Sequence, residues 1–107
     1  MRLEHYSPER IRQEIIVIVG RYLDVKKYRV FFFGSRVSGQ SREQSDIDVG
    51  IEGPVSVPFA VMTEIREEVE QLPTLYKIDI VDFFQVSPGF RSLALRQTQP
   101  LNFVKAL

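Results

Sequence analysis

Hydrophobic and polar residues alternate strictly in one short segment of the chain. From Asp46 onward the residues read Asp, Ile, Asp, Val, Gly, Ile. Because successive side chains of a strand point to opposite faces, this alternation predicts a strand with Asp46 and Asp48 together on one face. The apolar residues Ile47, Val49 and Ile51 then point the other way, into a core.

The rest of the chain reads as further strands and helices. An apolar run that ends abruptly at Gly34 predicts a strand, and apolar residues at helical spacing predict three helices. Ser7 and Ser87, each followed by proline, are predicted N-caps of two of these helices. Strands are predicted for residues 28–33, 46–51 and 75–83, helices for 8–23, 59–71 and 88–96, and a final short strand or a docking segment for 101–104. This order predicts a mixed α/β (α+β) fold, in one domain over residues 1–107.

A turn with affinity for phosphate is predicted directly after the first strand. Gly34 lacks a Cβ, so the backbone can turn sharply there and approach a ligand closely. Ser35 adds a hydroxyl beside backbone N–H groups that are free to face a phosphate. Arg36 and Arg42 lie in the loop that follows, where arginines are usually solvated but are also placed to contact phosphate.

The paired aspartates suit magnesium. Side chains two residues apart on a strand lie roughly 6.5 Å apart, so Asp46 and Asp48 can hold one or two cations between them. Magnesium prefers carboxylate and phosphate oxygens. The chain has no cysteine and a single histidine, His5, which excludes a zinc site.

The pattern G-S-x3-G-x5-S-D-I-D, from Gly34 to Asp48, resembles the signature of the DNA polymerase β-like nucleotidyltransferase superfamily, in particular its minimal nucleotidyltransferase (MNT) branch. The resemblance implies the polymerase β-like fold, a mixed sheet packed with helices, and ATP as a substrate. It implies that the nucleotide is held by Gly34, Ser35, Gly39 and Ser45. It also implies that catalysis and Mg²⁺ binding rest on Asp46, Asp48 and a third acid from a later strand.

Two aspartates of the third strand are candidates for that third acid. Asp79 lies between Ile78 and Ile80, and so fits the hydrophobic-Asp-hydrophobic pattern of the superfamily better than Asp82 does. Asp79 is therefore the predicted third acid. An ordinary solvent-facing acid on an edge strand is the alternative reading of Asp79.

The same resemblance implies a partner protein. Members of the MNT branch are often antitoxins that are paired with a HEPN-type ribonuclease toxin, and they can neutralise the toxin by transferring AMP from ATP to one of its tyrosines. This activity, within a heteromer, is the leading hypothesis. The alternatives are a non-catalytic module that inhibits its partner by occlusion, an aminoglycoside-type small-molecule nucleotidyltransferase, and a degraded member that binds nucleotide without turnover.

Composition narrows the class of partner and the location. The net charge is zero and the basic residues are scattered, which argues against nucleic acid as a direct partner. No apolar run is long enough to span a membrane, no signal peptide is evident, and cysteine is absent, so a cytoplasmic location is expected.

Two groups of residues carry no functional assignment from the sequence: the charged residues of the second helix and four phenylalanines near the end of the chain. The charged residues of the second helix are predicted to form a solvated face: Glu64, Arg66, Glu67, Glu68 and Glu70. Four phenylalanines belong either to a partner surface or to the core: Phe83, Phe84, Phe90 and Phe103.

Overall fold

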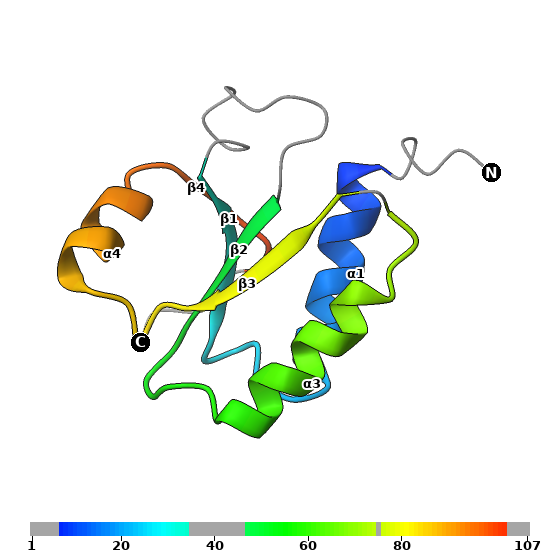
Figure 1. Cartoon of the computed structure of the whole chain (residues 1–107), viewed down its shortest axis with the longest axis horizontal. Helices are drawn as coiled ribbons and strands as arrows, with labels where there is room; N and C mark the ends of the chain where they lie inside the picture. The colour runs from blue at the N-terminus through cyan, green and yellow to red at the C-terminus, as the bar shows by residue number, and fades with distance from the viewer. Residues whose placement is uncertain (1–6, 35–46, 75, 103–107) are drawn as a thin grey trace.

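The structure is a computed structural model, which describes residues 7–34, 47–74 and 76–102. Helices and strands follow one another along the described chain (Figure 1). In order they are α1 (Pro8–Gly20), β1 (Arg29–Phe33), β2 (Ile47–Glu52), α3 (Phe59–Glu70), β3 (Ile78–Asp82), α4 (Pro88–Ala94) and β4 (Thr98–Pro100).

Within these described ranges, four strands form one sheet in the order β3-β2-β1-β4. β1 runs antiparallel to β2 and to β4, whereas β2 and β3 are parallel. Parallel neighbours need a crossover connection, and α3 supplies it between β2 and β3. The predicted mixed sheet with helices is therefore confirmed.

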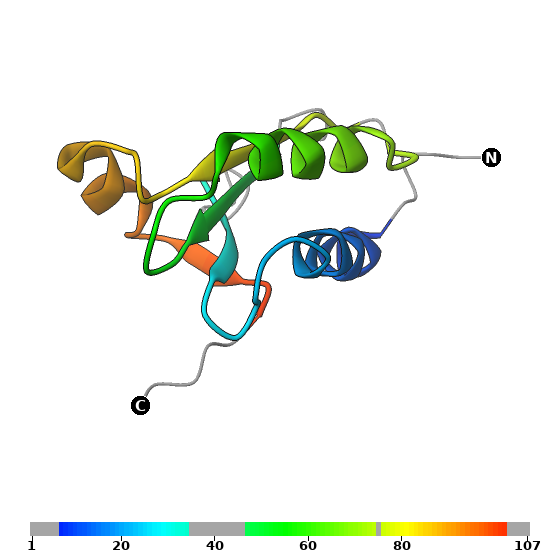
Figure 2. The ribbon, with the colours of Figure 1, turned by 90° about the horizontal axis from the view of Figure 1, so that it is seen from below.

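Helices α1 and α3 cover one face of the sheet, and α4 lies on the other side (Figure 2). The larger core fills the space under α1 and α3. As predicted, Ile47, Val49 and Ile51 of β2 are buried in it. The helices contribute Ile11, Ile15, Ile18, Val19, Met62, Ile65 and Val69 to the same core.

A smaller aromatic core lies on the opposite face of the sheet. The ring of Phe83 stands edge-on to the rings of Phe31 and Phe33, with ring centroids 5.0 Å apart in both pairs. Phe83 is only 1% exposed and thus belongs to the core, whereas Phe84 and Phe90 remain exposed. Phe103, the fourth phenylalanine considered from the sequence, lies outside the described residues.

Both predicted serine caps are present, but all three helices end earlier than predicted, α3 by one residue at Glu70. The Ser7 hydroxyl accepts a hydrogen bond from the Arg10 backbone N–H at 3.1 Å, and Ser87 caps α4 in the same way. α1 ends at Gly20 instead of Leu23, because the N–H groups of the next two residues bond to carbonyls three residues back and tighten the last turn. α4 ends at Ala94 instead of about Arg96 for the same reason, since the Arg96 N–H bonds to Leu93.

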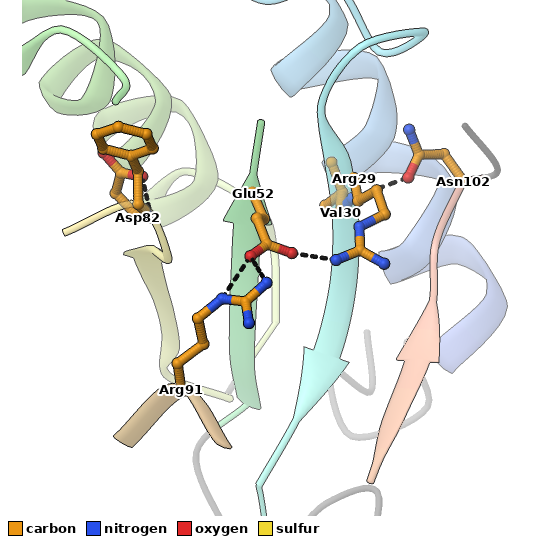
Figure 3. A network of polar contacts seen from close by, with 7 residues as sticks. Arg29, Val30, Glu52, Asp82, Arg91 and Asn102 are labelled. Carbon is orange, nitrogen blue, oxygen red and sulfur yellow. Dashed lines mark hydrogen bonds and ion pairs between the residues drawn. The ribbon is translucent and has the colours of Figure 1, made fainter. Parts of the chain in front are cut away.

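The final strand lies just before the segment predicted for it. β4 ends at Pro100, and the next residues serve as a docking segment. The Asn102 side chain accepts a hydrogen bond from the Val30 N–H at 2.8 Å (Figure 3). It also donates to the carbonyls of Val25 and Tyr28. These contacts fix the end of the described chain against the start of β1. Among the described helices, none is both long and apolar enough to cross a membrane.

Candidate active site

Two carboxylates meet on the face of the sheet that α1 and α3 leave uncovered. Asp48 is the second residue of β2, Asp79 is the second residue of β3, and the two are register partners in the parallel pair. Neighbouring strands lie about 4.8 Å apart, so the two side chains stand next to each other. Both are half-buried and line the same hollow. The structure therefore brings together two of the three acids predicted from the sequence.

The other candidate for the third acid has a structural role. Asp82 is 9% exposed, and its Oδ2 accepts a hydrogen bond from the Val57 N–H at 2.9 Å. Its Oδ1 accepts from the Phe84 N–H at 3.0 Å, and the Gln85 side chain also donates to the carboxylate. These bonds tie the loop before α3 to the end of β3. The geometry thus agrees with the preference for Asp79 over Asp82 as a site residue.

Gly34 packs directly against Asp48. It follows β1, whose last residue, Phe33, is the register partner of Asp48. Its φ is +87°, a left-handed conformation that favours glycine. A Cβ at this position would lie 2.6 Å from Oδ2 of Asp48. The turn predicted at Gly34 is therefore present, and its close approach to a ligand stays a prediction.

The remaining predicted site residues lie outside the described part of the chain. They are Ser35, Gly39, Ser45 and Asp46, together with the loop arginines Arg36 and Arg42. Their roles stay predictions.

The acid pair opens into a hollow of about 490 Å³. Residues of β3 form one part of its wall, Phe33 and Phe90 form another, and Arg66 and Glu70 reach it from α3. Pockets of this size hold small ligands or single side chains. The hollow can therefore admit a reacting group beside the two carboxylates.

Arg66 does more than the sequence suggested. Its Nη2 donates a hydrogen bond to the Ile80 carbonyl at 2.8 Å, on the outer edge of β3 and next to Asp79. Arg66 is exposed, as predicted for this face, but it also bonds to the sheet. The available signal was its place beside the apolar stripe, four residues after the buried Met62.

Glu68 is a second exception on the same helix. Its carboxylate accepts hydrogen bonds from the Arg21 guanidinium and the Tyr22 hydroxyl, both just beyond the end of α1. It therefore links the two helices that cover the larger core.

Glu52, at the end of β2, was not singled out from the sequence. Its carboxylate accepts hydrogen bonds from Arg91 of α4 and from Arg29 of β1 (Figure 3). Burial raises the pKa of Glu52, but the hydrogen bonds and positive charges of the two arginines outweigh it, so the pKa lies below its ordinary value. This network joins α4, and with it one wall of the hollow, to the sheet.

The donor set of the site suits a hard divalent cation. Asp48 and Asp79 offer carboxylate oxygens side by side, and the absence of a side chain at Gly34 keeps the space beside Asp48 clear. Over residues 7–34, 47–74 and 76–102, no group of three or more His, Cys, Asp or Glu side chains is placed to hold a metal ion. The described residues supply two of the three predicted ligands.

Known proteins resemble this chain in sequence and fold. A protein named "Probable protein adenylyltransferase MntA", from Haemophilus influenzae, is 29% identical over 85 residues, which cover 78% of this chain and 75% of the relative. A solved structure described as a minimal nucleotidyltransferase has a TM-score of 0.63 at 27% identity and covers 83% of this chain and 87% of its own.

Solved toxin–antitoxin complexes share the fold at lower identity. One complex, with AMP-PNP, contains a chain with a TM-score of 0.70 at 20% identity, over 88% of this chain and 73% of that one. Another complex is a tri-AMPylated Shewanella oneidensis HEPN toxin with an MNT antitoxin. It contains a chain with a TM-score of 0.65 at 18% identity, over 89% of this chain and 71% of that one.

The match to a family covers most of the chain and confirms the resemblance drawn from its motif. The family model described as "Polymerase beta, Nucleotidyltransferase" matches residues 13–102, which include Gly34, Asp48 and Asp79. The chain therefore belongs to the polymerase β-like nucleotidyltransferase family.

Proposed function

We propose that this protein is a magnesium-dependent adenylyltransferase that transfers AMP from ATP to a tyrosine hydroxyl of a HEPN-type ribonuclease toxin and thereby acts as its antitoxin. The observation that carries the proposal is the register pairing of Asp48 with Asp79 beside the turn at Gly34. The H. influenzae relative named as an adenylyltransferase and the AMPylated HEPN toxin bound to an MNT antitoxin support the choice of reaction and partner.

In this proposal the donor lies at the turn after β1. Gly34, Ser35, Gly39 and Ser45 hold the triphosphate of ATP through backbone N–H groups and hydroxyls. Nucleotidyl transfer depends mainly on positioning and charge stabilisation, so no protein nucleophile is needed.

Asp46, Asp48 and Asp79 are the proposed magnesium ligands. When bound, magnesium neutralises charge on the phosphate oxygens. Asp79 has a further role as the acid nearest the outer edge of the sheet, where it accepts the proton of the attacking hydroxyl. Asp48 lies on β2, between the strand that leads into the proposed donor site at Gly34 and the strand that carries Asp79.

The proposed setting is one catalytic domain, residues 1–107, in a heteromer with its toxin in the cytoplasm. ATP and a ribonuclease with cellular RNA as its target are both found there. The basic residues are scattered, so the proposal includes no direct contact with nucleic acid.

A labelling experiment tests the proposal. The wild-type protein and its Asp48→Asn and Asp79→Asn variants are incubated with α-labelled ATP and magnesium in a lysate of the source cells, and labelled protein is separated from labelled RNA. We expect one protein band with the wild type and a loss of label of at least about 100-fold in both variants. Mass spectrometry then identifies the protein and the modified tyrosine.

Glu67→Gln is the matched control, because Glu67 is an exposed acid on α3 that does not line the hollow. It should label as the wild type does, and all variants should keep the wild-type melting temperature within a few degrees. Full labelling by Asp48→Asn and Asp79→Asn would exclude the assigned site. Label in RNA alone would show that the acceptor is RNA and not a protein. Neutralisation of a bound toxin without any label would indicate inhibition by occlusion.

A further inference from the structure

The hollow beside Asp48 and Asp79 has an aromatic wall. Phe90 of α4 lines it and is 42% exposed. Its ring stands perpendicular to that of Phe33, with centroids 6.1 Å apart, and lies 5.9 Å from that of Phe83. Those two rings are buried and contact Phe90, whereas Phe90 itself is partly exposed and lines the hollow.

The hollow reaches from Phe33, at the end of β1, past Asp48 to β3. In the sheet, β2 lies between β1, which leads into Gly34, and β3, which forms the edge. β3 contributes more lining residues than any other element, and Arg66 and Glu70 of α3 lie beyond it. If the donor phosphates lie at Gly34, the attacking group must approach from the β3 side, because in-line displacement places the incoming and leaving oxygens on opposite sides of the phosphorus.

A second hollow of about 400 Å³ adjoins the first. The two share the lining residues Arg66 and Val81, and the second also includes Phe59 at the start of α3, which is 84% exposed. Two adjoining hollows can receive more than one side chain of an acceptor, which suits a polypeptide better than a small molecule.

We propose that this hollow is the acceptor subsite and that Phe90 selects an aromatic acceptor by packing against the phenolic ring of a tyrosine. This inference rests on the proposed function and assigns the subsite that receives the acceptor. Aromatic rings prefer edge-to-face or offset contacts at centroid distances of about 4.5–7 Å, and Phe90 already makes such contacts with the rings behind it. Serine and threonine have no ring and gain nothing from this wall.

The bound tyrosine points its hydroxyl at the acid pair. The phenolic oxygen forms a bond to the α-phosphorus of ATP, and the bond from that phosphorus to the oxygen bridging to the β-phosphate breaks. Pyrophosphate leaves with the bonding electron pair, and Asp79 takes the phenolic proton. Phe90 contacts the ring of the substrate but takes no part in the proton transfer.

The test separates acceptor binding from donor binding. KM is measured for the protein acceptor identified by labelling and, separately, for ATP, in the wild type and in Phe90→Ala, Phe90→Leu and Phe90→Tyr. We expect Phe90→Ala and Phe90→Leu to raise the acceptor KM about tenfold and to leave the ATP KM within about twofold. Phe90→Tyr keeps a ring and should retain the wild-type acceptor KM.

Phe84→Ala is the matched control, because Phe84 is a similarly exposed phenylalanine, 54% exposed, that lines neither hollow. It should leave both KM values unchanged. Phe90→Leu keeps apolar bulk against the aromatic core and thus remains informative if Phe90→Ala unfolds.

An acceptor KM unchanged in Phe90→Leu would overturn the subsite while leaving the proposed function intact. If Phe90→Leu instead raised the KM for ATP, Phe90 would contact the nucleobase, and the proposed acceptor subsite would also be overturned. If the wild type labels no protein at all, the proposed function fails, and the subsite fails with it.

Discussion

A Cβ atom at Gly34 would lie 2.6 Å from Oδ2 of Asp48, a distance that real side chains do not adopt. The turn after β1 and the acid on β2 therefore form one packed unit, in which any side chain at residue 34 would force the Asp48 carboxylate to shift. The positive φ of Gly34 gives the same residue a second reason to be glycine.

Gly34→Ala is expected to damage activity more than stability. The left-handed backbone costs about 1–2 kcal/mol for a residue with a Cβ. The new methyl group also pushes the Asp48 carboxylate aside, and a displacement of about 1 Å in a catalytic group costs on the order of 100-fold in rate. Transfer rates and urea denaturation of the variant measure the two effects separately.

Gly89→Ala is the control for this substitution. No atom lies within 4 Å of a Cβ at Gly89, so we expect an unchanged transfer rate and a change in the free energy of unfolding of at most about 1 kcal/mol. A wild-type transfer rate in Gly34→Ala would mean that the turn is not coupled to Asp48.

Truncation of the two aspartates of β3 should affect different properties: stability for Asp82 and transfer activity for Asp79. Asp82→Ala leaves the N–H groups of Val57 and Phe84 without their acceptor, and we expect it to lower the free energy of unfolding by about 2–4 kcal/mol. Asp79→Ala should change it by less than about 1 kcal/mol while it abolishes transfer. Urea denaturation and labelling on both variants test the pair, and equal loss of stability would contradict the division of roles.

Glu52 should make stability depend on pH in the acid range. Because the folded state lowers the pKa of Glu52 below its ordinary 4.5, its contribution is complete above pH 4.5 and is lost as the pH falls through the folded value. Glu52→Gln is expected to cost about 1 kcal/mol at pH 7, since both arginine partners are substantially exposed. Urea denaturation from pH 7 to pH 3 should show the difference from wild type shrinking as the pH falls below 4.5.

Glu67→Gln serves as the comparison, because Glu67 is an exposed acid on α3. It should change the free energy of unfolding at pH 7 by less than about 0.5 kcal/mol. A constant difference for Glu52→Gln over the whole pH range would show that the contact with Arg29 and Arg91 does not depend on the charge of Glu52.

Much of the fold could be predicted because its signals are local. The alternation at 47–51 gives the inward and outward faces of β2, and Ser7 and Ser87 mark helix starts by chemistry that acts within one turn. The glycine turn at Gly34 likewise depends on a single residue. Patterns of this kind need no knowledge of tertiary contacts.

The features that the sequence did not reveal depend on contacts between distant segments. Arg66 reaches the Ile80 carbonyl only because α3 crosses beside the edge strand, and Glu52 gains its two arginines from β1 and α4. Asn102 bonds to three residues near the start of β1. The charge pattern of a helix or the polarity of one residue does not identify such partners, so solvated surface was the reasonable expectation for Arg66.

Arg66 should act as a positioning residue for Asp79. Its hydrogen bond at 2.8 Å holds the carbonyl of Ile80, the residue after Asp79, on the outer edge of β3. We expect Arg66→Met, which keeps most of the apolar stem, to lower kcat about 10- to 100-fold while it changes the free energy of unfolding by less than about 1.5 kcal/mol. Arg66→Lys restores a donor and should recover part of the loss.

The control is Arg21→Met, which removes an arginine that pairs with Glu68 of α3 and does not line the hollow. Its kcat should equal that of the wild type. Because Asp79 is the proposed proton acceptor, loss of its position should lower kcat and leave the KM for ATP within about twofold of the wild type. If Arg66→Met lowers stability but leaves kcat unchanged, Arg66 only closes the edge of the sheet and does not position Asp79.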